Sequence, residues 1–219
     1  MYTIVINSQK GGSGKTMLCK HLSIEAERAG NGPVFLIDTD PQGTLTAWYS
    51  KREAKTPILV DVPFDNLSKG LILIKQHGAT YCLIDTASGR TEIAQELFKI
   101  ADLVIFPLQD SEDDLTAAPV TIKNIKAAGP PFVFVLTGVK PNTLITAQAA
   151  ALLSRYGQVA ETFITNRTGY RARWEKGQTV TEAEPKGPAA REMSSLWRNM
   201  KSCLHSPMRA LEPKEVVNG

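Results

Sequence analysis

Six short apolar runs, each followed by a polar residue or glycine and then by a helical stretch, constrain the fold of this chain most. They lie in the first 140 residues, at 3–6, 34–37, 58–60, 81–84, 103–106 and 132–136. Nearly continuous apolar character is typical of strands that crossover helices bury on both faces. We therefore predict an α/β fold with a doubly wound, mainly parallel sheet flanked by helices.

The same rhythm predicts where the helices lie and where a ligand would bind. Helices are expected from about Leu18 to Gly30, after Gly43, over 66–75, over 91–101 and after Ser111. After residue 140 the pattern becomes helical, with helices expected over 147–156, 169–176 and 188–203. Ligands of such sheets bind beyond the carboxyl ends of the strands, so the residues after each run are the candidate site. We expect one domain over residues 1–205 and a flexible tail over residues 206–219, which contain two prolines.

The chain lacks the sequence features of a membrane-spanning, secreted or disulfide-stabilised protein. No apolar run approaches the ~18 to 20 residues that cross a bilayer, and the N-terminus has no basic start of a signal peptide. The three cysteines, Cys19, Cys82 and Cys203, are too far apart for a zinc motif or a disulfide framework. We therefore expect a cytoplasmic protein with reduced thiols.

The strongest functional motif is QKGGSGKT, residues 9–16, between the first predicted strand and the first predicted helix. Its three glycines let the backbone wrap around an anion, so that amide N–H groups and a helix N-terminus point at it. Lys15 is placed to contact the β- and γ-phosphates of a nucleotide, and the Thr16 hydroxyl to ligate Mg²⁺. Gln9 departs from the strict phosphate-loop pattern, which has glycine there. The alternative is a glycine-rich turn that binds no ligand.

The residues that follow Gln9 form a variant of the phosphate-loop motif that is typical of one family. The segment Lys10-Gly11-Gly12-Ser13-Gly14-Lys15-Thr16 resembles the deviant Walker A box of the ParA/MinD ATPases, a class of P-loop NTPases. The resemblance implies ATP and Mg²⁺ as cofactors, with the nucleotide held by these seven residues, Met17 and Thr137. It also implies that Lys10 reaches across the interface of an ATP-bound homodimer to the partner subunit's nucleotide. The alternative for Lys10 is a surface lysine beside a phosphate site.

Aspartates follow the second and fourth apolar runs. Asp38-Thr39-Asp40-Pro41-Gln42 resembles the D-x-D-P-Q box of ParA proteins, which implies that Asp40 orients the attacking water and that Asp38 supports the metal site or the switch loop. Asp85 ends the fourth run and fits a Walker B residue, which holds Mg²⁺ directly or through water. The alternative for these aspartates is helix capping. We expect catalytic roles for Lys10, Lys15, Asp38 and Asp40, and a metal site formed by Thr16, Asp38 and Asp85.

The resemblance extends to about residue 203. Phe106-Pro107 with Ser111 and Asp114 is similar to a segment of small ParA proteins, and residues 164–180 resemble their C-terminal I-x-x-R-x-x-Y…G-x-x-V signature. Gly138 stands where the family often has Arg or Asn near the adenine, so a side-chain contact from that position is lost. The first strand begins at the N-terminus, without a preceding helix-turn-helix, so we expect a short, partition-type ParA protein.

Positive charge gathers in the C-terminal third. Residues 1–139 carry a net charge of −2 and residues 140–219 a net charge of +5. ParA-type dimers bind DNA without sequence preference through basic residues of this region, and such binding falls steeply with salt. The alternative is a solvated helix face. The resemblance implies DNA contacts by Arg167, Arg171, Arg173, Lys176, Arg191 and Arg198.

The last predicted helix carries an apolar stripe formed by Met193, Leu196, Trp197, Met200 and Leu204. Such a stripe either packs on the sheet or, with flanking basic residues, forms a membrane anchor of the MinD kind. We expect packing, because Trp197 suits a core, and we expect no membrane binding.

These features together predict an ATPase that segregates DNA and associates with the nucleoid. Its slow hydrolysis would be stimulated by a ParB-like centromere-binding protein. Two alternatives stay open. One is a MinD-like or cargo-positioning ATPase that acts on a membrane or a protein complex, and the other is a weakly hydrolysing accessory factor in DNA transfer.

Overall fold

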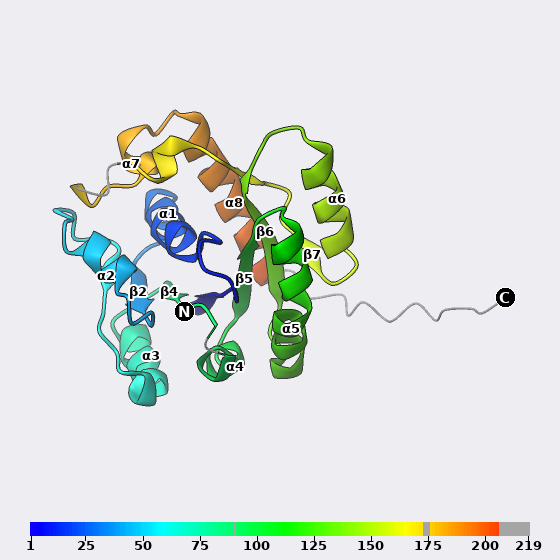
Figure 1. Cartoon of the computed structure of the whole chain (residues 1–219). Coiled ribbons are helices and arrows are strands. Elements are labelled where there is room, and N and C mark those ends of the chain that lie inside the picture. The colour runs from blue at the N-terminus through cyan, green and yellow to red at the C-terminus, as the bar shows by residue number, and fades with distance from the viewer. Residues whose placement is uncertain (90, 173–175, 206–219) are drawn as a thin grey trace.

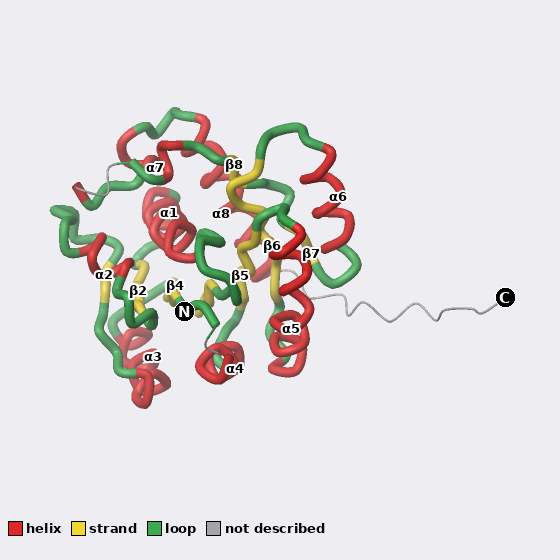
Figure 2. Tube along the Cα trace, in the orientation of Figure 1, coloured by secondary structure: helices red, strands yellow, loops and turns green. Residues whose placement is uncertain are grey.

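One parallel sheet organises the molecule (Figures 1 and 2). The computed structural model describes residues 1–89, 91–172 and 176–205. The strand order is β3-β2-β4-β1-β5-β6-β7, with β8 paired to β6, and all these pairings are parallel. Because the chain builds outward in both directions from β1, the doubly wound fold is confirmed. The strands are β1 (Tyr2–Ile6), β2 (Val34–Asp38), β3 (Ile58–Leu59), β4 (Tyr81–Asp85), β5 (Leu103–Leu108), β6 (Phe132–Val139), β7 (Gln158–Val159) and β8 (Ile164–Thr165).

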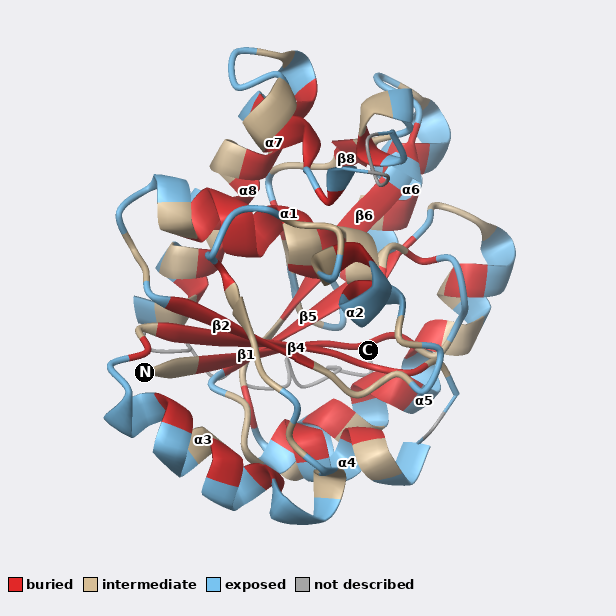
Figure 3. Cartoon of the chain, turned by 90° about the vertical axis from the view of Figure 1, so that its left-hand side faces the viewer, coloured by how far each residue is buried: buried red, intermediate tan, exposed pale blue. Residues whose placement is uncertain are grey.

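Helices cover both faces of the sheet. Figure 3 shows α1 and α8 on one face and α3, α4 and α5 on the opposite face. The α-helices are α1 (Lys15–Arg28), α2 (Thr44–Tyr49), α3 (Leu67–Gln76), α4 (Thr91–Lys99), α5 (Glu112–Ala128), α6 (Leu144–Leu153), α7 (Val180–Ala183) and α8 (Pro188–His205). Two short 3-10 helices, η1 (Phe64–Asn66) and η2 (Thr168–Tyr170), lie in the connections.

The central strand β1 explains why the apolar runs are nearly continuous. Its residues Ile4 and Ile6 are fully buried in the core on the α1 and α8 side, where Leu22 also lies. Val5, between them, is fully buried in the opposite core, which contains Phe98 of α4. A strand covered on both faces has no solvent side, so both sets of alternating residues are apolar. Each such side chain contributes about 1.5 to 3 kcal/mol by burial.

Two expectations for the region after residue 140 are wrong. The pattern is not purely helical, because β7 and β8 extend the sheet; strands of two residues are too short to leave a periodic signal. Instead of a helix starting at Gly169, the chain forms η2. Further along, Gly177 has a φ of +57°, and a Cβ there would lie 2.6 Å from the backbone nitrogen of Arg52, so the chain passes close to the loop after α2. Residues 173–175 and the predicted tail, 206–219, lie outside the described residues.

Candidate functional site

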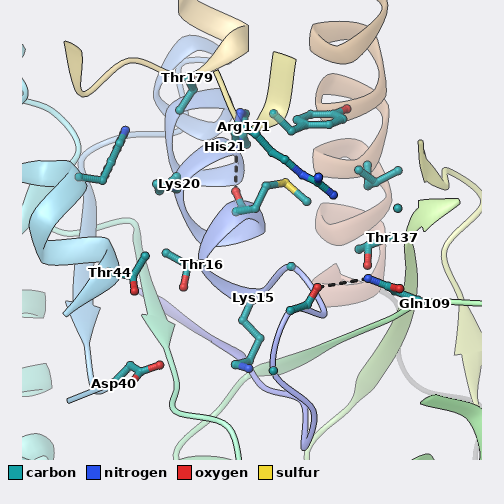
Figure 4. Close-up of a pocket in the computed structure, with 18 of the residues that line it drawn as sticks. Lys15, Thr16, Lys20, His21, Asp40, Thr44, Gln109, Thr137, Arg171 and Thr179 are labelled. Carbon is teal, nitrogen blue, oxygen red and sulfur yellow. Dashed lines mark hydrogen bonds between the residues drawn. The ribbon is translucent and has the colours of Figure 1, made fainter. Parts of the chain in front are cut away.

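The glycine-rich loop joins β1 to α1 in a conformation that glycine permits. Gly12 has a φ of +77° and Gly14, the residue before α1, a φ of +97°. Residues with a Cβ rarely adopt such values. Thr137 at the end of β6 holds the loop from the other side, because its Oγ1 donates a hydrogen bond of 2.6 Å to the Ser13 carbonyl oxygen. This loop and the start of α1 line an open pocket (Figure 4). The first N–H groups of a helix have no intrahelical partners and favour an anion there.

Lys15 is buried at the start of α1. Its Nζ donates to Ser88 Oγ and to the Lys10 carbonyl oxygen, which lies 3.3 Å away. Burial lowers the pKa of Lys15, and the charges of Asp85 and Asp40 act in the opposite direction. An ammonium group with neutral partners at a helix N-terminus is suited to bind phosphate oxygens.

Lys10 lies on the rim of the loop and points to its own subunit. Its Nζ is 2.9 Å from Asp114 Oδ1 and 3.4 Å from Asp113 Oδ2, at the start of α5. The hydrogen bond to Asp114 raises the pKa of Lys10. The Lys10 side chain is 46% exposed, so another molecule can reach it. Because its ammonium group is paired with these carboxylates, it must leave them to contact that molecule. Its contact with a partner subunit's nucleotide stays a prediction.

Asp85, at the end of β4, is the buried carboxylate of the site. It is 0% exposed, and neither carboxylate oxygen has a hydrogen-bond partner among the described residues. Burial raises the pKa of Asp85 to about 7, while the neighbouring Thr16 hydroxyl and Lys15 ammonium lower it. An unpartnered buried carboxylate needs a cation to offset its desolvation. Asp85 and Thr16 therefore fit a Mg²⁺ ion whose remaining ligands are phosphate oxygens and water.

Replacing Asp85 by asparagine is expected to stabilise the ligand-free protein at pH 8 by about 1 to 3 kcal/mol. Because the folded-state pKa is raised, the stability that Asp85 contributes is complete below its unfolded pKa and is lost as the pH rises through about 7. Chemical unfolding of D85N and the parent between pH 5 and 8 measures this difference. The exposed Asp61, as D61N, is the control. A D85N protein that is less stable than the parent at pH 8 would contradict the assignment.

Asp38, the last residue of β2, and Asp40, two residues later, have different surroundings. Both Oδ atoms of Asp38 are occupied: Oδ2 accepts from the Thr46 amide and hydroxyl at 2.9 Å, and Oδ1 accepts from the Asp40 amide. Asp38 thus fixes the start of α2 and the loop that carries Asp40, and its predicted support of the metal site stays a prediction. Asp40 lines the pocket, and its Oδ1 accepts from the Gln42 amide at 3.0 Å. Figure 4 shows Asp40 below the start of α1, with the Thr16 side chain of α1 on the same side of the view.

The pocket beside these residues has a volume of about 670 Å³. This size suits a nucleotide, because small-molecule sites typically measure ~300 to 1,000 Å³. Further polar residues also line it, among them Lys20, Ser88 and Gln109, which no sequence motif indicated. Gln109 Nε2 donates to the Gly12 carbonyl oxygen at 3.3 Å. The position of Gln109 directly after β5 was a usable signal, whereas Ser88 is brought to Lys15 only by folding.

A buried arginine joins the loop after α2 to the segment before α7. Its side chain is 2% exposed. Arg52 donates to Glu182 Oε1 at 2.9 Å and to the Gly177 carbonyl oxygen at 2.7 Å, and its guanidinium lies 4.8 Å from the centre of the Trp48 ring. Glu182 also accepts from the Thr179 amide. Arg52 therefore links the Asp40 side of the pocket to the C-terminal region.

Replacing Arg52 by alanine is expected to destabilise the protein by about 3 kcal/mol, because it leaves Glu182 without its charged partner and opens a cavity beside Trp48. The exposed pair Lys99–Glu96 provides the control, since K99A should change stability by less than about 0.5 kcal/mol. Denaturant unfolding of both variants measures the difference. Equal effects of R52A and K99A would show that Arg52 contributes no more than a surface ion pair.

The predicted DNA-binding arginines differ in their surroundings. Both Arg167 and Arg171 line the nucleotide-sized pocket, but Arg167 is engaged by Glu192 of α8, at 2.8 Å. Lys176, Arg191 and Arg198 are exposed, and Arg173 lies outside the described residues. Arg191 Nη1 donates to the Lys186 carbonyl oxygen, and Arg198 Nη2 to Ser195 Oγ. A role of these residues in binding DNA stays a prediction.

The apolar stripe of α8 faces the core. Met193, Leu196, Trp197 and Met200 are at most 1% exposed, and Trp197 packs edge-on against Tyr81 of β4. The stripe therefore packs on the sheet, as expected, and is not presented to a membrane. Within the described residues, no helix is long and apolar enough to span a bilayer.

Residues 4–180 match the family described as the CobQ/CobB/MinD/ParA nucleotide binding domain. The chain belongs to this family. The resemblance to ParA and MinD is thereby confirmed, and ATP hydrolysis is the activity of ParA- and MinD-type members. The phosphate loop, Asp40 and Asp85 all lie within the matched residues.

Known proteins of this family resemble the chain over most of its length. "Maintenance of carboxysome distribution protein A" of Halothiobacillus neapolitanus is 27% identical over 200 residues, covering 86% of this chain and 91% of that protein. "Protein ParA" of Rhizobium radiobacter is 26% identical over 200 residues, covering 85% and 88%. The solved structure of the septum site-determining protein MinD with Mg-ADP from Pyrococcus horikoshii has a TM-score of 0.73, 16% identity and coverage of 91% and 95%. At that identity, the structure shows the fold alone.

Proposed function

We propose that this protein is an ATP-dependent partition ATPase whose ATP-bound dimer binds DNA. One observation carries the proposal: folding brings Lys15, Thr16, Asp40 and Asp85 to one edge of the sheet, with Lys10 on the exposed rim. The relative named Protein ParA, which matches this chain over most of its length, supports it. Lys10 of each subunit leaves Asp114 and closes a sandwich dimer over the partner's nucleotide. The dimer binds DNA through basic C-terminal residues such as Lys176, Arg191 and Arg198. This binding associates the protein with the nucleoid.

Different residues of the pocket bind the phosphates, hold the metal ion and orient the attacking water during ATP hydrolysis. Lys15 and the amides of Gly11 to Thr16 bind the phosphates and offset the charge that develops on them. Mg²⁺, held by Thr16 and Asp85, supplies further charge neutralisation when bound. Asp40 accepts a hydrogen bond from the attacking water and aligns it, and Asp38 holds the loop that carries Asp40. Hydrolysis is slow because one orienting carboxylate leaves much of the barrier, and a ParB-like centromere-binding partner accelerates it.

The proposal is tested by a DNA-binding titration with ATP, with ADP and without nucleotide, repeated across salt concentrations. Binding is expected only with ATP and is expected to fall steeply with salt, because phosphate contacts release counterions. Sedimentation under the same conditions should show dimers only with ATP. Nucleotide-independent DNA binding, or monomers at saturating Mg-ATP, would contradict the proposed cycle.

A second candidate is the positioning of a protein complex by the same ATP cycle. The carboxysome-distribution relative favours it, since that protein matches this chain over most of its length. Purification of the tagged protein with bound ATP distinguishes the candidates by whether a DNA-binding protein or a cargo complex accompanies it. Membrane positioning and a weakly hydrolysing role in DNA transfer are weaker alternatives. Flotation with vesicles and the hydrolysis rate with DNA test them.

A further inference from the structure

The pocket has a phosphate end and a second end that would hold the sugar and base. The loop from Gly11 to Thr16 defines the first end. From there the pocket continues past Met17 to Thr137 and Gly138 of β6 and to the residues after β8. Because Gly138 has no side chain and is exposed, any side chain that contacts a base at this end must come from another segment.

Most polar side chains at this end already have structural partners. Thr137 Oγ1 donates to the loop at Ser13. Three others converge on Glu192 of α8: the Thr165 hydroxyl at 2.8 Å, the Arg167 guanidinium at 2.8 Å and the Tyr170 hydroxyl at 2.7 Å. These four groups hold the wall of the pocket together and are therefore poorly placed to bind a ligand.

Arg171 differs from these groups. Its side chain is exposed, and the structure gives it one hydrogen bond, from Nη2 to Asn166 Oδ1, at the long distance of 3.5 Å. Figure 4 shows the guanidinium reaching into the pocket between α1 and Thr137. The pocket thus contains a planar cation without an acidic partner among the described residues, at the end opposite the phosphate loop.

We propose that Arg171 contacts the nucleobase, stacking its guanidinium on the purine ring, instead of serving the DNA surface. This inference rests on the proposed ATP binding and identifies how the base is held where Gly138 supplies no side chain. An arginine plane stacks on aromatic rings and carries its charge with weak hydration. Stacking recognises the area of the ring, so Arg171 favours purines over pyrimidines and distinguishes adenine from guanine poorly.

Calorimetric titration of the full chain with Mg-ATP, Mg-GTP and Mg-tripolyphosphate tests the proposal. Arg171→Ala is expected to weaken ATP and GTP binding by about 5- to 30-fold and to leave tripolyphosphate binding within about twofold of the parent. Arg171→Lys, which keeps the charge and loses the plane, should weaken ATP binding in the same way. Arg155→Ala removes an exposed arginine after α6 that does not line the pocket, and should change none of the three.

Each departure from this pattern overturns the assignment in a distinct way. Equal weakening of ATP and tripolyphosphate would show that Arg171 acts on the phosphates through its charge. Unchanged ATP binding by R171A, with weaker binding of the ATP-loaded dimer to DNA, would return Arg171 to the DNA surface. Parental ATP binding by R171K would exclude stacking. If the parent itself binds no ATP, the proposed function fails, which is a separate result.

Discussion

Replacing Lys15 by alanine is expected to weaken ATP binding by about 100-fold and to abolish ATP-dependent dimerisation and DNA binding. Lys15 is the buried cation at the start of α1, and its present partners, Ser88 Oγ and the Lys10 carbonyl oxygen, are neutral. Phosphate oxygens would replace them with charge-assisted hydrogen bonds, which are the strong ones. Calorimetry with Mg-ATP, followed by sedimentation and DNA titration, measures the three effects.

A stability measurement separates this loss from misfolding. Burial lowers the pKa of Lys15, which means that the ligand-free fold disfavours its ammonium form. We therefore expect ligand-free K15A to be at least as stable as the parent. Lys99→Ala, at an exposed position on α4, is the matched control for the removal of a lysine. If K15A still forms dimers and binds DNA when ATP is added, nucleotide gating through this loop is excluded.

Replacing Asp40 by asparagine or alanine is expected to lower the rate of ATP hydrolysis by about 100-fold, with little change in ATP affinity. The carboxylate lines the pocket opposite the start of α1, and its contact to the Gln42 amide leaves one oxygen available for water. Asparagine can still accept that amide hydrogen bond, so D40N isolates the charge from the loop structure. Single-turnover phosphate release gives the rate, and calorimetry gives the affinity.

The two variants of Asp40 also test where its effect arises. D40N and D40A should hydrolyse ATP equally slowly, while both still form ATP-dependent dimers that bind DNA. Hydrolysis by D40A at the parental rate would remove Asp40 from the mechanism. Loss of dimerisation in D40A but not in D40N would instead assign Asp40 to the loop structure.

Much of the fold followed from the sequence because its signals are local. Strands β1, β2, β4, β5 and β6 are buried on both faces, so each left an apolar run. The helix after Ser111 begins as expected, because Ser111 Oγ accepts a hydrogen bond from the Asp114 amide. The helix expected over 147–156 begins at Leu144 instead, where Thr143 Oγ1 accepts from the Thr146 amide. The strands β7 and β8 and the helix expected at Gly169 were misjudged. The two-residue strands β7 and β8 form only because they pair with β6, which no local pattern indicates. The first residues of the helix expected at Gly169 form η2 instead.

The parts of the candidate site that could be predicted are those next to strand ends. Lys15, Thr16, Asp40 and Asp85 are fixed by their distance along the chain from a strand. Ser88 and the Arg52–Glu182 contact are brought together by segments far apart in sequence, so no spacing indicates them. Arg167 and Arg171 illustrate the same point, because charge and resemblance do not distinguish them, whereas in the structure Glu192 holds Arg167 and Arg171 has no acidic partner among the described residues.

The phosphate loop, the doubly wound sheet and the family can be read from the residues in order, because glycine positions and apolar runs act through local backbone geometry and burial. Which charges are free to act depends on how the folded chain brings distant residues together. Ion pairs and hydrogen bonds form over a few ångströms of space, whatever the separation along the chain. Lys10 therefore lies against Asp114, Asp38 accepts hydrogen bonds from Thr46 of α2 and from the Asp40 amide, and Asp85 alone keeps its buried oxygens unpartnered among the described carboxylates.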